Sequence, residues 1–162
     1  MDSSIQSAII QAANNAGVDP SLAVAVAQQE SGGDQSARGS SGEVGIFQLM
    51  PATAAGLGVN PYDATQNILG GVEYLAQQIS AFGDLSQALA AYNWGPANVK
   101  AAVAQYGSNW LSHAPASTQS YVSSILASTS LASFLPAGLT TTEILPWALG
   151  GFGILAIVIA IS

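Results

Sequence analysis

The strongest constraint on the fold is a series of helix start and stop signals, with no convincing strand pattern between them. Asp19-Pro20 and other Asp or Pro residues precede positions with apolar residues at helical spacing, and glycines follow them. Helices begin and end in this way. We therefore expect an all-α fold with at most one small β-like piece. The predicted helices span residues 3–16, 21–31, 51 to Gly56 or Gly58, 65–82, 85–93, 96–106 and 117–127, with a loop over 107–116.

The composition excludes several classes of function. The chain has 162 residues, 49% apolar and only 7% charged, and its net charge is −7. Nucleic-acid binding needs a basic face, and only Arg38 and Lys100 are available, so we expect no nucleic-acid partner. The absence of cysteine excludes disulfides and thiolate metal sites. The single histidine, His113, excludes a metal site built on several histidines and is expected in a solvated loop.

An apolar segment without charge covers residues 144–161. As a helix it is long enough to cross a hydrocarbon core of about 30 Å if nearly untilted, and Trp147 lies near its start, as an interfacial aromatic would. We expect a catalytic domain over residues 1–127, a linker over 128–143 and a transmembrane helix over 144–162. A buried core helix is the alternative.

Signals for export and orientation are weak. Residues 1–6 lack the basic and apolar regions of a secretory signal peptide, so export by that route is not expected. No Lys or Arg flanks residues 144–161. The usual excess of basic residues on one side therefore predicts no membrane orientation.

Glu30 is the acidic residue whose position is hardest to explain by helix capping. Leu22, Val26 and Glu30 are four residues apart, so the carboxylate continues an apolar stripe. Burial and the negative end of the helix dipole both disfavour its charged form, which raises its pKa. A carboxylic acid kept protonated near neutral pH is suited to act as the general acid in glycosidic cleavage. A surface glutamate at a helix end is the alternative.

Aromatic and amide residues extend this hypothesis. The Tyr92-Asn93-Trp94 segment stands where a helix meets a turn, and Gln48 and Met50 lie just before a helix. Sugar sites use aromatic faces against the pyranose ring and amides for its hydroxyl and acetamido groups. Each of these residues is equally typical of a core or turn position when taken alone.

Four separated motifs over residues 1–127 together resemble the soluble lytic transglycosylase (SLT) domain. The motifs are Glu30-Ser31, Gly45-Ile46-Phe47-Gln48-Leu49-Met50-Pro51-Ala52-Thr53-Ala54, Asn67-Ile68 with Gly71 and Tyr74-Leu75, and Ala90-Ala91-Tyr92-Asn93-Trp94-Gly95-Pro96. The resemblance implies a mostly helical, lysozyme-like fold of the goose type. It also implies cleavage of the β-1,4 bond between N-acetylmuramic acid and N-acetylglucosamine in peptidoglycan.

The resemblance implies a role for each matching residue. Glu30 would be the single catalytic acid and base, and Ser31 would shape the end of its helix. Gln48 and Met50 would line the sugar site, Tyr92 would contact the sugar at the cleavage point, and Asn93 would support it.

The sequence departs from the family pattern at two places near the site. Ile46-Phe47 stands where the family commonly has Leu-Met, which is a tolerable apolar replacement. The family usually has a serine nine residues after the glutamate, in contact with the acetamido group, and this chain has Gly39 there. Ser40 and Ser41 follow directly, and Ser40 is taken as the candidate replacement.

The family mechanism needs only one carboxylate, because the muramyl N-acetyl group is thought to replace the nucleophile. Glu30 would protonate the leaving oxygen and then take the proton from the C6 hydroxyl, which closes a 1,6-anhydro ring. No water, metal or cofactor takes part, so none is expected.

Two other functions fit the sequence. A lysozyme-type hydrolase would act on the same substrate with water as acceptor, and Asp34 and Glu43 are the nearby carboxylates that could serve it. A non-catalytic peptidoglycan-binding membrane protein of a secretion or conjugation system is the second alternative.

The expected partners are peptidoglycan glycan strands, a lipid membrane through residues 144–162, and other membrane proteins of a virion. We expect a bacteriophage virion protein that opens the cell wall locally during entry. The alternative location is a bacterial inner membrane, with the domain facing the periplasm.

Overall fold

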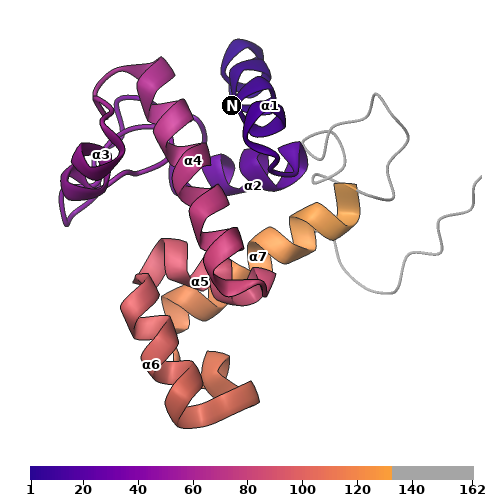
Figure 1. Cartoon of the computed structure of the whole chain (residues 1–162). Coiled ribbons are helices and arrows are strands. Elements are labelled where there is room, and N and C mark those ends of the chain that lie inside the picture. Colours follow the sequence, from indigo (N-terminus) through magenta and orange to yellow (C-terminus); the bar gives the residue numbers. More distant parts are fainter. Residues whose placement is uncertain (133–162) are drawn as a thin grey trace, which may run out of the picture.

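The computed structural model describes the backbone of residues 1–132 and the side chains of residues 1–129 (Figure 1). Over this range the chain consists of helices joined by short turns and one longer loop. The helices are α1 (Ser3–Ala16), α2 (Pro20–Ser31), α3 (Pro51–Leu57), α4 (Ala64–Phe82), α5 (Leu85–Trp94), α6 (Pro96–Tyr106), the 3₁₀ helix η1 (Gly107–His113) and α7 (Ala116–Ala132).

The predicted all-α class is confirmed over residues 1–132. The only β-like pairing there consists of two isolated bridges, Arg38 with Val44 and Val44 with Leu49. Both lie in the segment between α2 and α3. The sequence allowed for one small β-like piece without placing it.

Local capping explains where most of the helices begin. The side chains of Asp2, Asp19 and Asp84 accept hydrogen bonds from backbone N–H groups in the first turns of α1, α2 and α5. Asp63 caps α4 in the same way through the N–H of Gln66, a role that the sequence analysis missed. Each of these bonds satisfies a backbone donor that the helix itself leaves free.

Two predicted boundaries in the last third of the domain were wrong. Residues 107–113 form η1 rather than a loop, because Trp110 is buried and holds this segment against the core. Helix α7 continues to Ala132, beyond the predicted end at 127. The hydroxyls of Ser128 and Thr129 donate to backbone carbonyls one turn earlier, so these polar residues continue the helix.

Helix α4 occupies the middle of the molecule (Figure 1). It packs against α1, α3 and α5, and α7 packs against both α5 and α2. The core includes Val26 of α2, Phe47 before α3, Leu75 of α4, Leu89 of α5 and Ile125 of α7. This packing places the carboxyl-terminal end of α2 next to α7.

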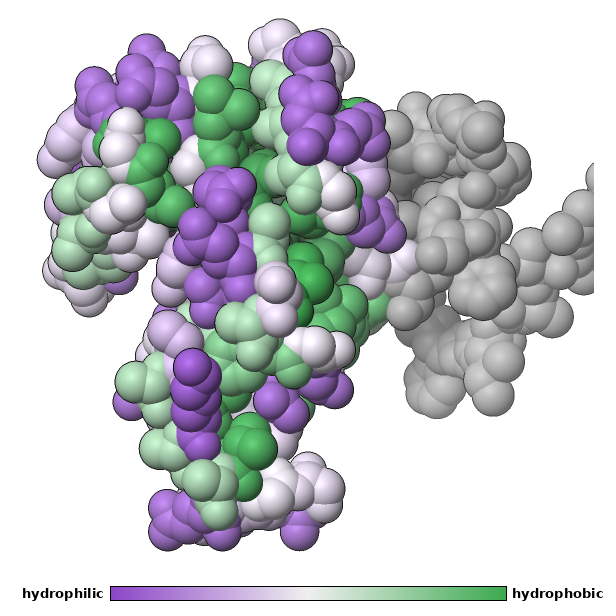
Figure 2. Space-filling view, in the orientation of Figure 1, coloured by the Kyte–Doolittle hydropathy of each residue, from purple (hydrophilic) through white to green (hydrophobic). Residues whose placement is uncertain are grey.

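Figure 2 shows a hydrophilic surface over the middle of α4. Glu73 and Gln77 of this helix are exposed. Within residues 1–132, none of the helices combines the length and the hydropathy that a membrane crossing requires. The predicted transmembrane helix over 144–162 and most of the predicted linker lie outside the described residues.

Candidate functional site

Glu30 lies one residue before the end of α2, on the face that carries Leu22 and Val26 into the core. Its side chain is half-buried. Burial raises the pKa of Glu30 to about 7, the negative charge of Glu43 adds to this effect, and a hydrogen bond from Tyr121 opposes it. The carboxyl group is therefore about half protonated at neutral pH. It can both donate and accept a proton in that range.

Tyr121 on α7 contacts Glu30 directly. Its hydroxyl donates a hydrogen bond of 2.6 Å to Oε1 of Glu30. Burial raises the pKa of Tyr121 well above its usual value, and the neighbouring Glu30 adds to this, so the phenol remains a donor at neutral pH. Tyr121 was not among the site residues predicted from the sequence. The available signal was a tyrosine on the buried face of α7 with Val122 and Ile125, because a buried phenol hydroxyl needs a partner.

Tyr92 lies at the end of α5 and faces the same carboxyl group. Burial raises its pKa, and the charge of Glu30 adds to the shift. The hydroxyl of Tyr92 donates to the backbone oxygen of Phe47 at 2.9 Å, and its ring lies 5.1 Å from the ring of Tyr74. Tyr92 therefore joins α5 to the segment before α3, close to Glu30.

Ser31 fixes the end of α2. Its hydroxyl donates to the backbone oxygen of Ile46 at 2.8 Å and accepts from the N–H groups of Gly33 and Asp34, both at 3.1 Å. These bonds hold the loop after α2 and the segment before α3 against the residue that follows Glu30. The hydroxyl is thus used within the protein, and it shapes the helix end.

Gln48 has an unusual backbone conformation. Its φ is 45°, the one positive φ among the non-glycine residues in the described part of the chain. Its side-chain amide donates to the backbone oxygen of Gly45 at 2.8 Å, which closes a tight turn. Non-glycine residues rarely adopt this conformation, and they do so most often at functional sites.

The other predicted site residues lie around this centre in different environments. Asn93 accepts a hydrogen bond of 2.9 Å from the hydroxyl of Thr118, which ties α5 to α7. Met50 stands immediately before α3 with 40% of its surface exposed. Ser40 is exposed in the loop after α2, and so is Ser41. His113 is also exposed, at the end of η1, where it stacks on Tyr106, the last residue of α6.

Asn67 on α4 holds the segment before α3 in place. It is fully buried, accepts from the N–H of Phe47, and donates to the backbone oxygens of Val44 and Pro61, with all three distances between 2.8 and 2.9 Å. Asn67 belongs to one of the four sequence motifs, but no role was predicted for it. Its amide replaces the backbone pairing that an irregular segment cannot make for itself.

The two carboxylates considered for a hydrolase differ in their surroundings. Asp34 is exposed, and its carboxylate accepts two hydrogen bonds of 2.7 Å from the N–H and the hydroxyl of Ser36, which form a turn. Its pKa is lowered, first by the hydroxyl bond. Glu43 is half-buried, and its charge acts on Glu30. Glu43 is therefore the second carboxylate that belongs to the site.

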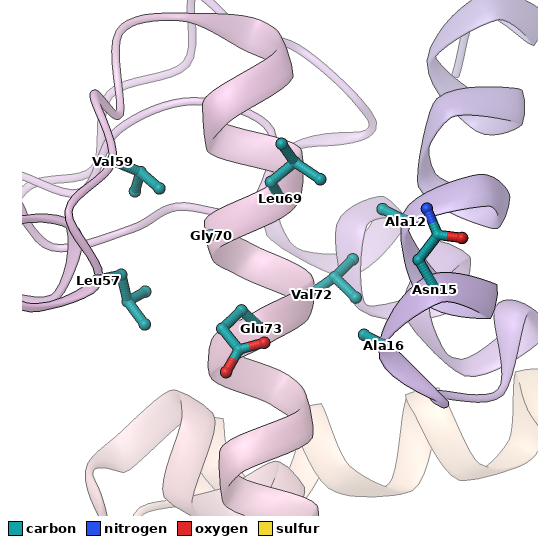
Figure 3. A pocket seen from close by; sticks show the side chains of 9 residues that line it. All are labelled: Ala12, Asn15, Ala16, Leu57, Val59, Leu69, Gly70, Val72 and Glu73. Atoms are coloured by element: carbon teal, nitrogen blue, oxygen red, sulfur yellow. The ribbon is translucent and has the colours of Figure 1, made fainter.

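A pocket elsewhere on the molecule contains none of the predicted site residues. It has a volume of about 320 Å³ and opens between α1, α4 and the end of α3 (Figure 3). Its walls are mostly apolar, and Glu73 is their one acidic side chain: Ala12, Asn15, Ala16, Leu57, Val59, Leu69, Gly70, Val72 and Glu73. The carboxylate of Glu73 accepts a hydrogen bond from Gln77. The chemistry therefore points to the end of α2 rather than to this pocket.

Metal ligands are not grouped in the part of the chain that the structure covers. No three His, Cys, Asp or Glu residues among residues 1–132 lie close enough together to hold a metal ion.

Comparison with known families gives a match over most of the domain. The family model of the transglycosylase SLT domain matches residues 7–112, which include Glu30 and every other predicted site residue. A transglycosylase of Enterobacteria phage PRD1 is 47% identical over 79 residues, covering 48% of this chain and 30% of that protein. A membrane-bound lytic murein transglycosylase F of Desulfosudis oleivorans is 38% identical over 100 residues, covering 57% of this chain and 22% of the relative. The chain thus spans less than a third of the length of these relatives.

Solved structures of lytic transglycosylases have a similar fold. The lytic transglycosylase Slt of Pseudomonas aeruginosa, solved as an inactive glutamate-to-glutamine mutant, gives a TM-score of 0.69 at 28% identity. The match covers 77% of this chain and 23% of that one. The 70 kDa soluble lytic transglycosylase of Escherichia coli gives 0.67 at 26% identity, over 75% of this chain and 23% of that one. The predicted lysozyme-like architecture is confirmed for the described residues.

Proposed function

This chain belongs to the transglycosylase SLT domain family, and from that premise we propose that it is a peptidoglycan lytic transglycosylase with Glu30 as its general acid and base. The observation that carries the proposal is the half-buried Glu30 carboxyl group with a pKa of about 7. An ordinary glutamate is almost fully ionised at neutral pH and is a poor acid there. The Pseudomonas aeruginosa relative, named as an inactive glutamate-to-glutamine mutant, also supports an essential glutamate.

The proposed reaction cleaves the β-1,4 bond between N-acetylmuramic acid and N-acetylglucosamine. Glu30 first gives its proton to the leaving glycosidic oxygen, while the muramyl N-acetyl group stabilises the sugar carbon in place of an enzyme nucleophile. The resulting carboxylate then takes the proton of the C6 hydroxyl. The C6 oxygen bonds to the anomeric carbon, and a 1,6-anhydro-muramic acid end is formed.

The residues around Glu30 are proposed to prepare it for both steps. The hydroxyl of Tyr121 orients the carboxyl group and stabilises its ionised form after the first proton transfer. Ser31 fixes the end of α2, and Tyr92 and Asn93 fix the end of α5 next to it. We propose that the sugar chain lies along Gln48, Met50 and Tyr92, with Ser40 at the rim of the site.

A Glu30→Gln variant tests the proposal. Glutamine keeps the size of the side chain and accepts the Tyr121 hydrogen bond, but it cannot transfer a proton. We expect cleavage of purified peptidoglycan to fall by a factor on the order of 10³, the range typical of general acid–base catalysis. Mass spectrometry of the muropeptides would show 1,6-anhydro ends with the wild type and not with the variant. Unchanged activity in a folded variant would refute the role of Glu30.

The same experiment separates the transglycosylase from the alternatives. Products with reducing ends, each heavier by one water, would indicate a lysozyme-type hydrolase. The half-buried second carboxylate of Glu43 is the observation that favours that alternative. Binding to peptidoglycan without any cleavage by the wild type would indicate a non-catalytic binding protein.

We further propose that residues 144–162 anchor the domain, after a linker that ends at 143, in the membrane of a bacteriophage virion. The similarity to a transglycosylase of a phage and to a transglycosylase named as membrane-bound supports this location. The partners would be the lipid bilayer, other virion membrane proteins and the peptidoglycan strands. Recovery of the full chain in purified virions, with release only by detergent, is the expected result. Full-length protein that stays in solution without lipid would contradict the anchor.

A further inference from the structure

The loop after α2 folds the side chain of Glu43 back onto its own backbone. The N–H of Gly39 donates to the backbone oxygen of Glu43 at 2.9 Å, and the N–H of Gly42 donates to the backbone oxygen of Gly39 at 3.2 Å. The N–H of Ser41 donates to Oε2 of Glu43 at 2.9 Å. These bonds hold the carboxylate over Gly39 instead of letting it extend into solvent.

This arrangement requires a residue without a side chain at position 39, which is Gly39. A Cβ atom on residue 39 would lie 2.1 Å from Oε2 and 2.8 Å from Cδ of Glu43, far closer than any real contact. The backbone of Gly39 is not in the left-handed region, so its conformation alone does not call for glycine. The glycine therefore makes room for the carboxylate.

The adjacent chain brings Glu43 to the end of α2. Val44, the next residue, is buried and forms bridges with Arg38 and Leu49. Two residues further on, the backbone oxygen of Ile46 accepts the hydroxyl of Ser31, the neighbour of Glu30. The half-buried carboxylate of Glu43 is thus held in a segment that is fastened directly beside Glu30.

We propose that Glu43 is a positioning residue that acts through Glu30: its carboxylate, folded over Gly39, places a second negative charge beside the catalytic carboxyl group. The proposal rests on the proposed role of Glu30, and it holds whether the C6 hydroxyl or water is the acceptor. A like charge nearby disfavours ionisation, so Glu43 keeps Glu30 protonated to higher pH.

The other groups that face Glu30 are neutral in the working range. Tyr121 from α7 and Tyr92 from α5 both have pKa values well above the usual value for tyrosine, mainly through burial. Among the described residues, Glu43 is the one whose charge acts on Glu30. Removal of the Glu43 charge should therefore lower the pKa of Glu30.

The test is a Glu43→Gln variant of the full chain, because glutamine keeps the size and can still accept the Ser41 N–H. We expect the alkaline limb of the kcat/KM profile to move to lower pH, with activity about threefold lower at pH 8 and close to wild type at pH 5. A titration of the Glu30 carboxyl carbon by NMR should move in the same direction. This titration reads the charge effect without any catalytic turnover.

Two further variants serve as controls for this test. Gly39→Ala keeps both carboxylates but pushes that of Glu43 away, so it should shift the limb in the same direction as Glu43→Gln. Asp34→Asn removes a charge from the same loop at an exposed turn, and it should leave the limb unchanged.

The outcomes are distinct. A Glu30 titration in Glu43→Gln that matches the wild type overturns the proposal, and so does a loss of activity that is equal at every pH. If the wild type releases no muropeptides, the proposed function fails instead. The NMR titration would then still decide whether Glu43 acts on Glu30.

Discussion

The two ends of α2 each carry a carboxylate, and the surroundings of the two groups shift their pKa values in opposite directions. At the first end, Asp19 accepts hydrogen bonds from the N–H and the hydroxyl of Ser21, two residues away. The hydroxyl bond is the main cause that lowers the pKa of Asp19. At the other end, burial raises the pKa of Glu30 to about 7.

The partners at the two ends also differ in their distance along the chain. Asp19 is stabilised by its immediate neighbours, and Pro20 begins the helix. Glu30 receives its hydrogen bond from Tyr121, 91 residues later, and the adjacent Ser31 donates to Ile46. The first end is thus defined by the local sequence, and its carboxylate stabilises the fold. The second end is assembled from distant segments, and burial of the ionised Glu30 carboxylate there destabilises the fold. The function that we propose resides at the second end.

The largest expected effect comes from breaking the long-range assembly at Asn67. Asn67→Ala leaves the N–H of Phe47 and the backbone oxygens of Val44 and Pro61 without partners in a buried place. Each such loss is worth 1–3 kcal/mol, so we expect the free energy of unfolding to fall by about 4 kcal/mol. Urea unfolding measures this, and peptidoglycan cleavage should fall as well, because the segment before α3 loses its position.

Gln77→Ala on the same helix is the matched control. Gln77 is exposed, and its amide donates only to the carboxylate of Glu73. The expected change is within about 0.5 kcal/mol, as is usual for surface positions. A comparable loss in both variants would mean that Asn67 matters only as part of α4.

The difference between the two ends also explains how much could be predicted. The starts of α1, α2, α5 and α6 follow from Asp or Pro residues within one turn, and the sequence pattern places them within a residue of the observed starts. The position of Glu30 on an apolar face was equally readable, because a spacing of four residues defines a helix face. These signals are local, so a single sequence contains them.

Contacts between distant segments could not be predicted in the same way. No local signal connects Tyr121 to Glu30, or Asn67 to the backbone of Phe47 and Val44. The burial of Trp110, which converts a predicted loop into η1, depends likewise on its place in the core that distant segments build together. The resemblance to the SLT family supplied the site residues, but the folding of Glu43 over Gly39 appears only in three dimensions.

The next largest effect is expected at Glu30 itself. The folded state binds the Glu30 proton more tightly than the unfolded state, whose pKa is near 4.5. The stability that this proton provides is complete below pH 4.5 and is lost as the pH rises through 7. Glutamine is uncharged at every pH, so Glu30→Gln removes the cost of burying an ionised carboxylate. We therefore expect the variant to be more stable than the wild type at pH 8 by up to about 3 kcal/mol.

Urea unfolding at pH 4 and pH 8 checks this expectation. The two proteins should have nearly the same stability at pH 4, where Glu30 is protonated in both states, and they should diverge as the pH rises. An identical pH dependence in the two proteins would show that Glu30 is not held in an unfavourable state.

The smallest effect concerns the local end of α2. Asp19→Ala removes the cap, and we expect the free energy of unfolding to fall by about 1 kcal/mol at pH 7, while cleavage per folded molecule stays unchanged. Because the pKa of Asp19 is lowered in the folded state, its contribution is present above pH 4 and is lost as the pH falls further. The difference between variant and wild type should therefore narrow in acid. Asp19→Asn, which keeps a capping oxygen, should retain most of the stability at pH 7. A loss in Asp19→Ala as large as that in Asn67→Ala would mean that local capping, not the long-range assembly, dominates the stability of both ends.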